Sequence, residues 1–232
     1  MYNSDNLYKR LKTLYYALFG QPRAYKKDLL YFKKCSSVLD IGCGHGHFAG
    51  NDIGKIIGID INTDSVKLCH KKSITALVSD VLKIPFRANS FDGVHCAHVI
   101  EHFEYPKVKD LLQEIDRVLS PNGILLIKTP MPNKFFFNDV THVRPYPPSA
   151  LFALMGLSTD NQYAFDTHDK HKFKFSDLYF SRRQLFQPDI EVGIAPGKYF
   201  GRTVFKAFGM LIGKLGIRHW EKSEYTMVFQ KL

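Results

Sequence analysis

The sequence predicts an α/β protein built on a mostly parallel, doubly wound sheet with helices on both faces. One observation is a turn rich in glycine that directly follows the first apolar run. The other is that short apolar runs alternate with segments of helical periodicity, which makes consecutive strands parallel and puts helices on both faces. The predicted strands lie at about 38–41, 56–60, 75–79, 91–96 and 123–129, and the predicted helices between them at about 64–72 and 105–119.

The glycine turn follows the run Val38–Ile41, and Gly42, Gly44 and Gly46 stand there at alternate positions. Glycine allows positive φ and the close approach of a ligand. A strand that leads through such a turn into a helix presents free N–H groups and the positive end of the helix dipole. The turn therefore predicts a site for an anionic ligand group. A dinucleotide is one alternative, but its fingerprint has a third glycine where His47 stands.

Carboxylates close the next two apolar runs, since Asp60 ends the second run and Asp80 ends the third. Ligands of a parallel sheet bind outside the carboxyl ends of the strands, so these two acids should lie near the glycine turn and near Ala97–His98. An ionised aspartate has two oxygens that accept hydrogen bonds. Asp60 can therefore take both hydroxyls of a ribose.

The pattern D-x-G-x-G-x-G at Asp40–Gly46 resembles motif I of the class I S-adenosylmethionine (SAM) methyltransferases. Further blocks resemble the same family in the same order, over about residues 36–130. They are the second strand with Asp60, the third strand with Asp80, the fourth strand at Ser90–Val94 with His98–His102 behind it, and the turn Pro121–Ile127 into the fifth strand.

This resemblance implies a SAM-dependent methyltransferase, with S-adenosylhomocysteine as the product. It also implies a Rossmann-like sheet of seven strands whose antiparallel last strand is Tyr225–Gln230. In the family, the acid after the second strand binds the ribose and the acid after the third strand contacts the adenine amino group. The implied cofactor-binding residues are Asp40, Gly42, Cys43, Gly44, Gly46, Asp60, Ile61, Asp80, Val81 and His98.

The 232 residues are expected to form one methyltransferase domain. Residues 1–34 would form helices, with a lid over the cofactor and simple packing on the sheet as the two alternatives. Residues 35–130 would form the SAM-binding core. Residues 131–232 would form the substrate side, with loops, a basic and aromatic insertion at about 166–200, and the last strand.

The segment Lys134–Tyr146 is aromatic, polar and marked by proline, which predicts a loop over the site before a short helix at Pro148–Met155. It resembles the D-P-T-H-V-R-P-Y segment of methyltransferases of glycan and surface-polysaccharide pathways, with Val140 in place of the proline. An acceptor oxygen must lose a proton, and a histidine can take it near neutral pH.

The candidate base is His142, with a role in fixing the loop as the alternative, and His98 is the second candidate catalytic residue. Arg144 and Tyr146 are candidate substrate-binding residues, Arg144 for an anionic group. His98–His102 also matches H-x-x-E-H, a zinc signature. Zinc requires a third protein ligand and a helix that sets both histidines on one face. Methyltransferases carry the same letters at this place, so we expect no metal.

The net charge of +10 lies outside the predicted core, because residues 35–130 carry 10 basic and 11 acidic side chains. The flanks therefore suit an anionic partner, with a solvated basic surface as the alternative. We expect a small-molecule or glycan-type acceptor that is methylated on oxygen. RNA, a quinone-like lipid and a non-catalytic SAM-binding role are the alternatives.

The expected location is the cytoplasm. The four cysteines lack metal-site spacing, and neither a signal peptide nor an apolar run long enough to cross a bilayer is found in the sequence. Peripheral membrane contact through the apolar segment Val204–Ile217 is an alternative, with packing of that segment on the sheet as the competing interpretation.

Overall fold

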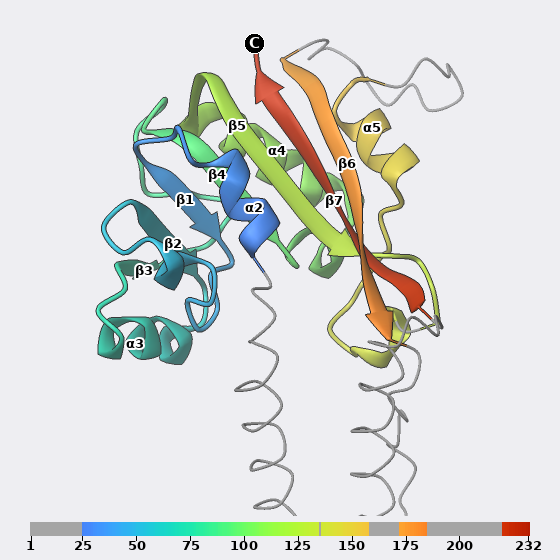
Figure 1. Cartoon of the computed structure of the whole chain (residues 1–232), viewed down its shortest axis with the longest axis horizontal. Coiled ribbons are helices and arrows are strands. Elements are labelled where there is room, and N and C mark those ends of the chain that lie inside the picture. Colours follow the sequence, from blue (N-terminus) through green and yellow to red (C-terminus); the bar gives the residue numbers. More distant parts are fainter. Residues whose placement is uncertain (1–24, 135, 158–171, 185–219) are drawn as a thin grey trace, which may run out of the picture. The chain divides into compact units, whose positions relative to one another are not determined.

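The computed structural model describes residues 25–134, 136–157, 172–184 and 220–232 (Figure 1). The chain divides into two compact units. One unit comprises Tyr25–Ser181 with Ser223–Leu232 and holds nearly all of the described residues. The other comprises Met1–Ala24 with Arg182–Lys222 and lies mostly outside them.

The described strands form a seven-stranded sheet with the order β3-β2-β1-β4-β5-β7-β6. The first five strands pair in parallel, and β7 pairs antiparallel to β5. The sequence order reverses between β1 and β4, so the sheet is doubly wound, as predicted. The strands are β1 (Val38–Ile41), β2 (Ile56–Asp60), β3 (Ala76–Val78), β4 (Phe91–Ala97), β5 (Leu119–Pro130), β6 (Phe173–Gln184) and β7 (Trp220–Lys231).

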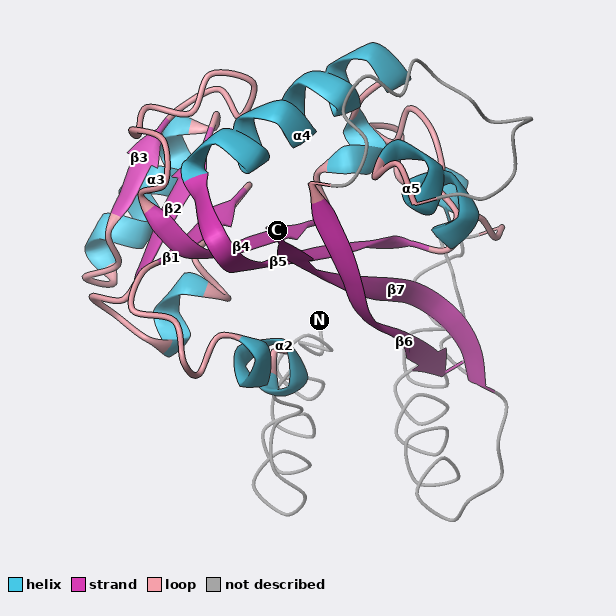
Figure 2. Cartoon of the chain, turned by 90° about the horizontal axis from the view of Figure 1, so that it is seen from above, coloured by secondary structure: helices cyan, strands magenta, loops and turns pink. Residues whose placement is uncertain are grey.

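Helices cover both faces of this sheet, and Figure 2 shows α2 and α4 on opposite sides of it. One buried cluster joins Phe32, at the end of α2, to Val66 of α3 and Val38 of β1. A second cluster joins Leu111 of α4 and Leu151 of α5 to other strand residues. The helices are α2 (Lys26–Tyr31), α3 (Thr63–Lys71), α4 (Tyr105–Val118) and α5 (Pro148–Leu154), with short 3₁₀ turns η1 (Ala49–Asn51), η2 (Ile100–His102) and η3 (Phe136–Asn138).

The local sequence explains where these elements begin. All four residues of β1 are buried, as expected for a central parallel strand. The side chain of Asn62 caps α3 by accepting hydrogen bonds from the backbone N–H groups of Asp64 and Ser65 at 2.9 and 3.1 Å. Since the predicted strands and helices of the core all form within a few residues of their expected bounds, the α/β prediction is confirmed.

One expectation is wrong in part. The sequence predicted an insertion at about 166–200, but residues 173–184 form β6, which is an edge strand of the sheet. An edge strand tolerates charged side chains, and here exposed Lys174 follows buried Phe173. The charged side chains therefore suggested an insertion where the chain forms an edge strand.

Other predictions fall outside the described residues. They are residues 1–24 of the expected N-terminal helices, the remainder of the insertion except Lys172, and the apolar segment at 204–217. None of the helices in the described part of the chain has the length and apolar character that crossing a bilayer requires.

Candidate active site

The glycine turn leaves β1 with positive φ at Gly42, Gly44 and Gly46, at 68°, 49° and 74°. A Cβ atom on Gly42 would lie 2.5 Å from Cγ2 of Val99, so packing excludes a side chain there. A Cβ atom on Gly44 would meet nothing within 4 Å. Val99 therefore fills the space beside Gly42, whereas the space beside Gly44 is open and a ligand can approach the backbone there.

Asp60 fastens this turn to the end of β2. Its Oδ2 accepts a hydrogen bond from the backbone N–H of Gly44 at 2.8 Å, and its Oδ1 accepts one from the N–H of Asn62 at 2.8 Å. A carboxylate offers about four acceptor positions, so both oxygens can accept further hydrogen bonds. Asp60 therefore holds the turn in place and still has acceptor positions that a ligand could use.

The neighbouring predicted residues divide into exposed and buried ones. Ile61 is 72% exposed, and Asp80 is exposed with its Oδ1 accepting a hydrogen bond from the N–H of Leu82 at 2.9 Å. Cys43 and Val81 are buried. Cys43 and Val81 could therefore contact a cofactor only through their backbone, whereas Ile61 and Asp80 could contact it with their side chains.

Asp40 is buried at the end of β1, just before the glycine turn, and is 3% exposed. Its Oδ1 lies 2.7 Å from Nδ1 of His95. Its Oδ2 has no hydrogen-bond partner among the described residues. A buried carboxylate oxygen without a partner is costly, and a cationic ligand group would remove that cost.

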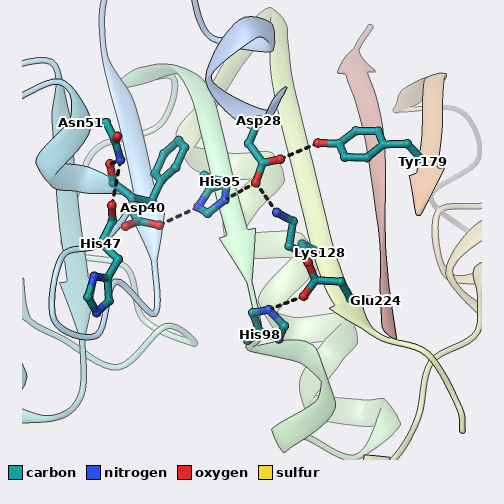
Figure 3. A network of polar contacts seen from close by, with 10 residues as sticks. Asp28, Asp40, His47, Asn51, His95, His98, Lys128, Tyr179 and Glu224 are labelled. Atoms are coloured by element: carbon teal, nitrogen blue, oxygen red, sulfur yellow. Dashed lines mark hydrogen bonds and ion pairs between the residues drawn. The ribbon is translucent and has the colours of Figure 1, made fainter. Parts of the chain in front are cut away.

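A buried charge network extends from Asp40 across the sheet (Figure 3). Asp28 of α2 accepts hydrogen bonds from Lys128 of β5 and, at 2.6 Å, from the hydroxyl of Tyr179 of β6. Its Oδ2 also lies 3.7 Å from Nε2 of His95, which is an ion-pair distance rather than a hydrogen bond. Asp28 therefore joins α2 to three strands.

The charges of this network stabilise one another. Burial alone would raise the pKa of Asp28, but His95 and Lys128 outweigh it and lower that pKa to about 2. Burial alone would lower the pKa of His95, but Asp28 and Asp40 outweigh it and raise that pKa. The sequence reasoning missed this network, although one signal was present: His95 and Lys128 stand within apolar strand runs.

His98 lies directly after β4 in a left-handed backbone conformation, with φ of 57°. Its Nδ1 lies 3.2 Å from Oε1 of Glu101, and its Nε2 lies 3.0 Å from Oε2 of Glu224 (the second contact is drawn in Figure 3). Burial would lower its pKa, but the two carboxylates raise it to about 9. His98 is therefore protonated near neutral pH and cannot accept a proton there, which makes it unsuited to the role of general base.

The predicted substrate loop is tied to the segment behind β4. The backbone N–H groups of Val143 and Arg144 donate to the carbonyl oxygen of Glu101 at 2.8 and 3.2 Å. Nδ1 of His142 lies 2.8 Å from the carbonyl oxygen of Phe136. The loop thus brings His142 to the C-terminal side of β4, where His98 lies.

Of the two predicted substrate-binding residues, Arg144 is exposed, whereas Tyr146 is only 2% exposed. The hydroxyl of Tyr146 donates to the carbonyl oxygen of Phe103 at 2.9 Å. The structure therefore corrects the expected role of Tyr146: its side chain belongs to the core, where it anchors the end of the loop.

The comparisons with known proteins agree with this geometry. Residues 39–127 match the methyltransferase domain family. A tRNA (carboxymethyluridine(34)-5-O)-methyltransferase of Xenopus tropicalis is 38% identical over 96 residues, which is 40% of this chain and 15% of that protein. A probable pectin methyltransferase of Arabidopsis thaliana is 30% identical over 118 residues, 47% of this chain and 17% of that protein.

The fold also has solved counterparts. A SAM-dependent methyltransferase from Archaeoglobus fulgidus aligns with a TM-score of 0.61 at 22% identity, covering 95% of this chain and 99% of that chain. The chain spans only a small part of the length of these two curated relatives. The glycine turn, the carboxylates at the strand ends and the sheet order agree with the family match, and residues 39–127 therefore form a methyltransferase domain.

Proposed function

We propose that this chain is an active methyltransferase that moves the methyl group of SAM to an oxygen of a small-molecule or glycan-type acceptor. The observation that carries the proposal is the glycine turn, which is open at Gly44 and fastened by the carboxylate of Asp60 at 2.8 Å. This arrangement lies at the carboxyl ends of parallel strands, where such sheets bind their ligands.

The residues around the turn fit the chemistry of SAM, which has an ammonium group, a sulfonium, a ribose and an adenine. Asp40 offers a buried carboxylate oxygen that has no partner among the described residues, which suits a cationic group. Asp60 can accept hydrogen bonds from the ribose hydroxyls. Asp80 and the exposed side chain of Ile61 offer an acceptor and an apolar surface to the adenine.

SAM supplies a methyl group on a sulfonium, and its transfer is an in-line displacement that depends on positioning. The protein must orient the acceptor and remove the proton from its oxygen. His142 is suited to remove that proton. Since Nδ1 of His142 faces a carbonyl oxygen, that nitrogen must carry the proton, and the neutral ring then has its lone pair on Nε2. His142 therefore acts on the acceptor oxygen through Nε2.

Two observations support an acceptor of glycan type: the loop from Lys134 to Tyr146 resembles that of glycan-pathway methyltransferases, and one relative is named for pectin. A tRNA methyltransferase named for an oxygen position supports oxygen as the acceptor atom. RNA is the second candidate, supported by the basic flanks and by relatives named as tRNA methyltransferases.

The acceptor class can be tested by labelling. Purified protein and tritiated-methyl SAM are added to a cell extract separated into nucleic acid, lipid, polysaccharide and small molecules. We expect label in the polysaccharide or small-molecule fraction, in a bond with the stability of an ether or ester rather than of an N-methyl group. Label mainly in RNA would favour the second candidate, and no transfer by a protein that binds SAM would leave only a cofactor-binding role.

The replacement His142→Ala should lower the turnover number about a hundredfold or more, because a general base acts in the transition state. Its affinity for SAM should stay unchanged. Steady-state kinetics with the labelled acceptor fraction, and calorimetry with SAM, measure the two effects. His70→Ala is the control, since His70 is exposed on α3 and its ring pairs with the carbonyl oxygen of Ala76. An equal loss of SAM affinity in His142→Ala would contradict this role.

A further inference from the structure

We propose that Glu101, His102 and His142 form a binding site for a divalent transition-metal ion, with zinc as the first candidate. One ligand atom from each of these three side chains lies within 4.8 Å of the others. Two imidazoles and one carboxylate are a known ligand set for catalytic zinc and for other first-row metals. The proposal replaces the expectation from the sequence that no metal is bound.

The hydrogen bonds of the two histidines fix the tautomer that a metal needs. Nδ1 of His102 lies 3.0 Å from the carbonyl oxygen of Thr141, and Nδ1 of His142 lies 2.8 Å from that of Phe136. A carbonyl oxygen only accepts hydrogen bonds, so both Nδ1 atoms donate. Each neutral ring then keeps its lone pair on Nε2. Histidines that bind metals commonly donate their other N–H to a carbonyl or carboxylate in this way.

The carboxylate is held as firmly as the two rings. Glu101 is fully buried, and the hydroxyl of Thr129 donates to its Oε2 at 3.0 Å. His98 contacts its Oε1, so a second partner orients the carboxylate. The N–H groups of Val143 and Arg144 bind the carbonyl of Glu101 and thereby hold the loop of His142 against it. The three candidate ligands are therefore held in place by hydrogen bonds before any ion arrives.

One of the two histidine ligands is not the one that the pattern H-x-x-E-H suggests, which would be His98. Both ring nitrogens of His98 already face carboxylates, those of Glu101 and Glu224. His142 takes its place, and its ring centroid lies 5.2 Å from that of His102. His142 comes from a loop 40 residues after His102, which only the tertiary structure brings close.

Three protein ligands leave at least one coordination position for another group. This part of the inference rests on the proposed function, because an oxygen of the acceptor would fill that position. The ion would then hold the acceptor oxygen on the substrate side of β4. In that case Nε2 of His142 binds the ion and does not take the acceptor proton, so the metal site and the role of His142 as general base are alternative uses of one lone pair.

The site can be tested on the full chain, stripped with a chelator and titrated with zinc against a competing chromophoric chelator. We expect one ion per chain for the parent. His102→Asn and His142→Asn should each weaken zinc binding about a hundredfold, since even supporting residues of metal sites contribute 10–100-fold. Asparagine keeps a side-chain N–H for the carbonyl partner, which preserves the local fold. His70→Asn is the matched control and should bind zinc like the parent.

A second measurement separates loss of metal from loss of structure. Zinc should raise the melting temperature of the parent and of His70→Asn, while the two site variants melt near the metal-free parent with and without zinc. Cobalt(II) in place of zinc should give the visible spectrum of a nitrogen- and oxygen-bound ion in the parent only. A parent without stoichiometric zinc binding, or site variants that bind zinc like the parent, would overturn the inference.

The outcome stays distinct from that of the proposed function. Calorimetry with SAM on the same preparations reports the cofactor site, which contains none of these three ligands. SAM binding and methyl transfer without zinc binding would refute the metal site and leave the proposed function intact. Zinc binding without SAM binding would do the reverse.

Discussion

Asp60→Ala should weaken the binding of SAM about a hundredfold. Hydrogen bonds to a charged acceptor contribute about 1.5–3 kcal/mol each, and Asp60 is expected to accept two from the ribose, so a loss of roughly 3 kcal/mol follows. The structure adds a second reason for the loss: the same carboxylate holds the N–H of Gly44 at 2.8 Å, so its removal also releases the glycine turn. Calorimetry with SAM measures the effect.

Asp64→Ala is the matched control for this experiment. Asp64 stands four positions later in the first turn of α3, and its side chain is 89% exposed. Its replacement should leave the affinity for SAM close to that of the parent. If Asp60→Ala folds and binds SAM within a few-fold of the parent, the ribose contact assigned to Asp60 is wrong, and so is the placing of the cofactor at the end of β2.

Lys128→Met should lower the free energy of unfolding by about 3–5 kcal/mol, the usual cost of removing one partner of a buried ion pair. The side chains of Lys128 and Asp28 are 4% and 1% exposed, so water does not replace the lost partner. Asp28 would keep His95 and Tyr179 but lose its contact with β5. Urea unfolding, followed by circular dichroism, measures the change.

Two further variants show whether the pair explains that loss. In Lys128→Met with Asp28→Asn the uncompensated charge is removed, so the double variant should be more stable than the sum of the two single changes predicts. Lys67→Met is the control, because the pair of Lys67 and Asp64 is 66% and 89% exposed and solvent screens it. A loss in Lys128→Met no larger than in this control would show that the network adds little to stability.

The architecture, and the edge of the sheet where a ligand should bind, could be predicted from the sequence alone. Apolar periodicity is a local property, and it placed β1, β2, β4 and α4 within a few residues of where they form. Parallel strands carry their carboxyl ends to one edge, which predicts Asp60 beside the glycine turn, and the structure ties Asp60 to Gly44 of that turn at 2.8 Å. The positive φ values of the turn follow from its glycines.

The pairing of the polar side chains could not be predicted from the sequence, because it depends on the tertiary structure. Asp28, Lys128 and Tyr179 meet from positions up to 151 residues apart, and His142 reaches Glu101 and His102 through a loop. The burial of Tyr146 was decided in the same way, by a core assembled from several elements. Local sequence patterns indicate whether a residue faces the core or the solvent. The partner across the sheet depends on strand order and loop path, which no short stretch of sequence encodes.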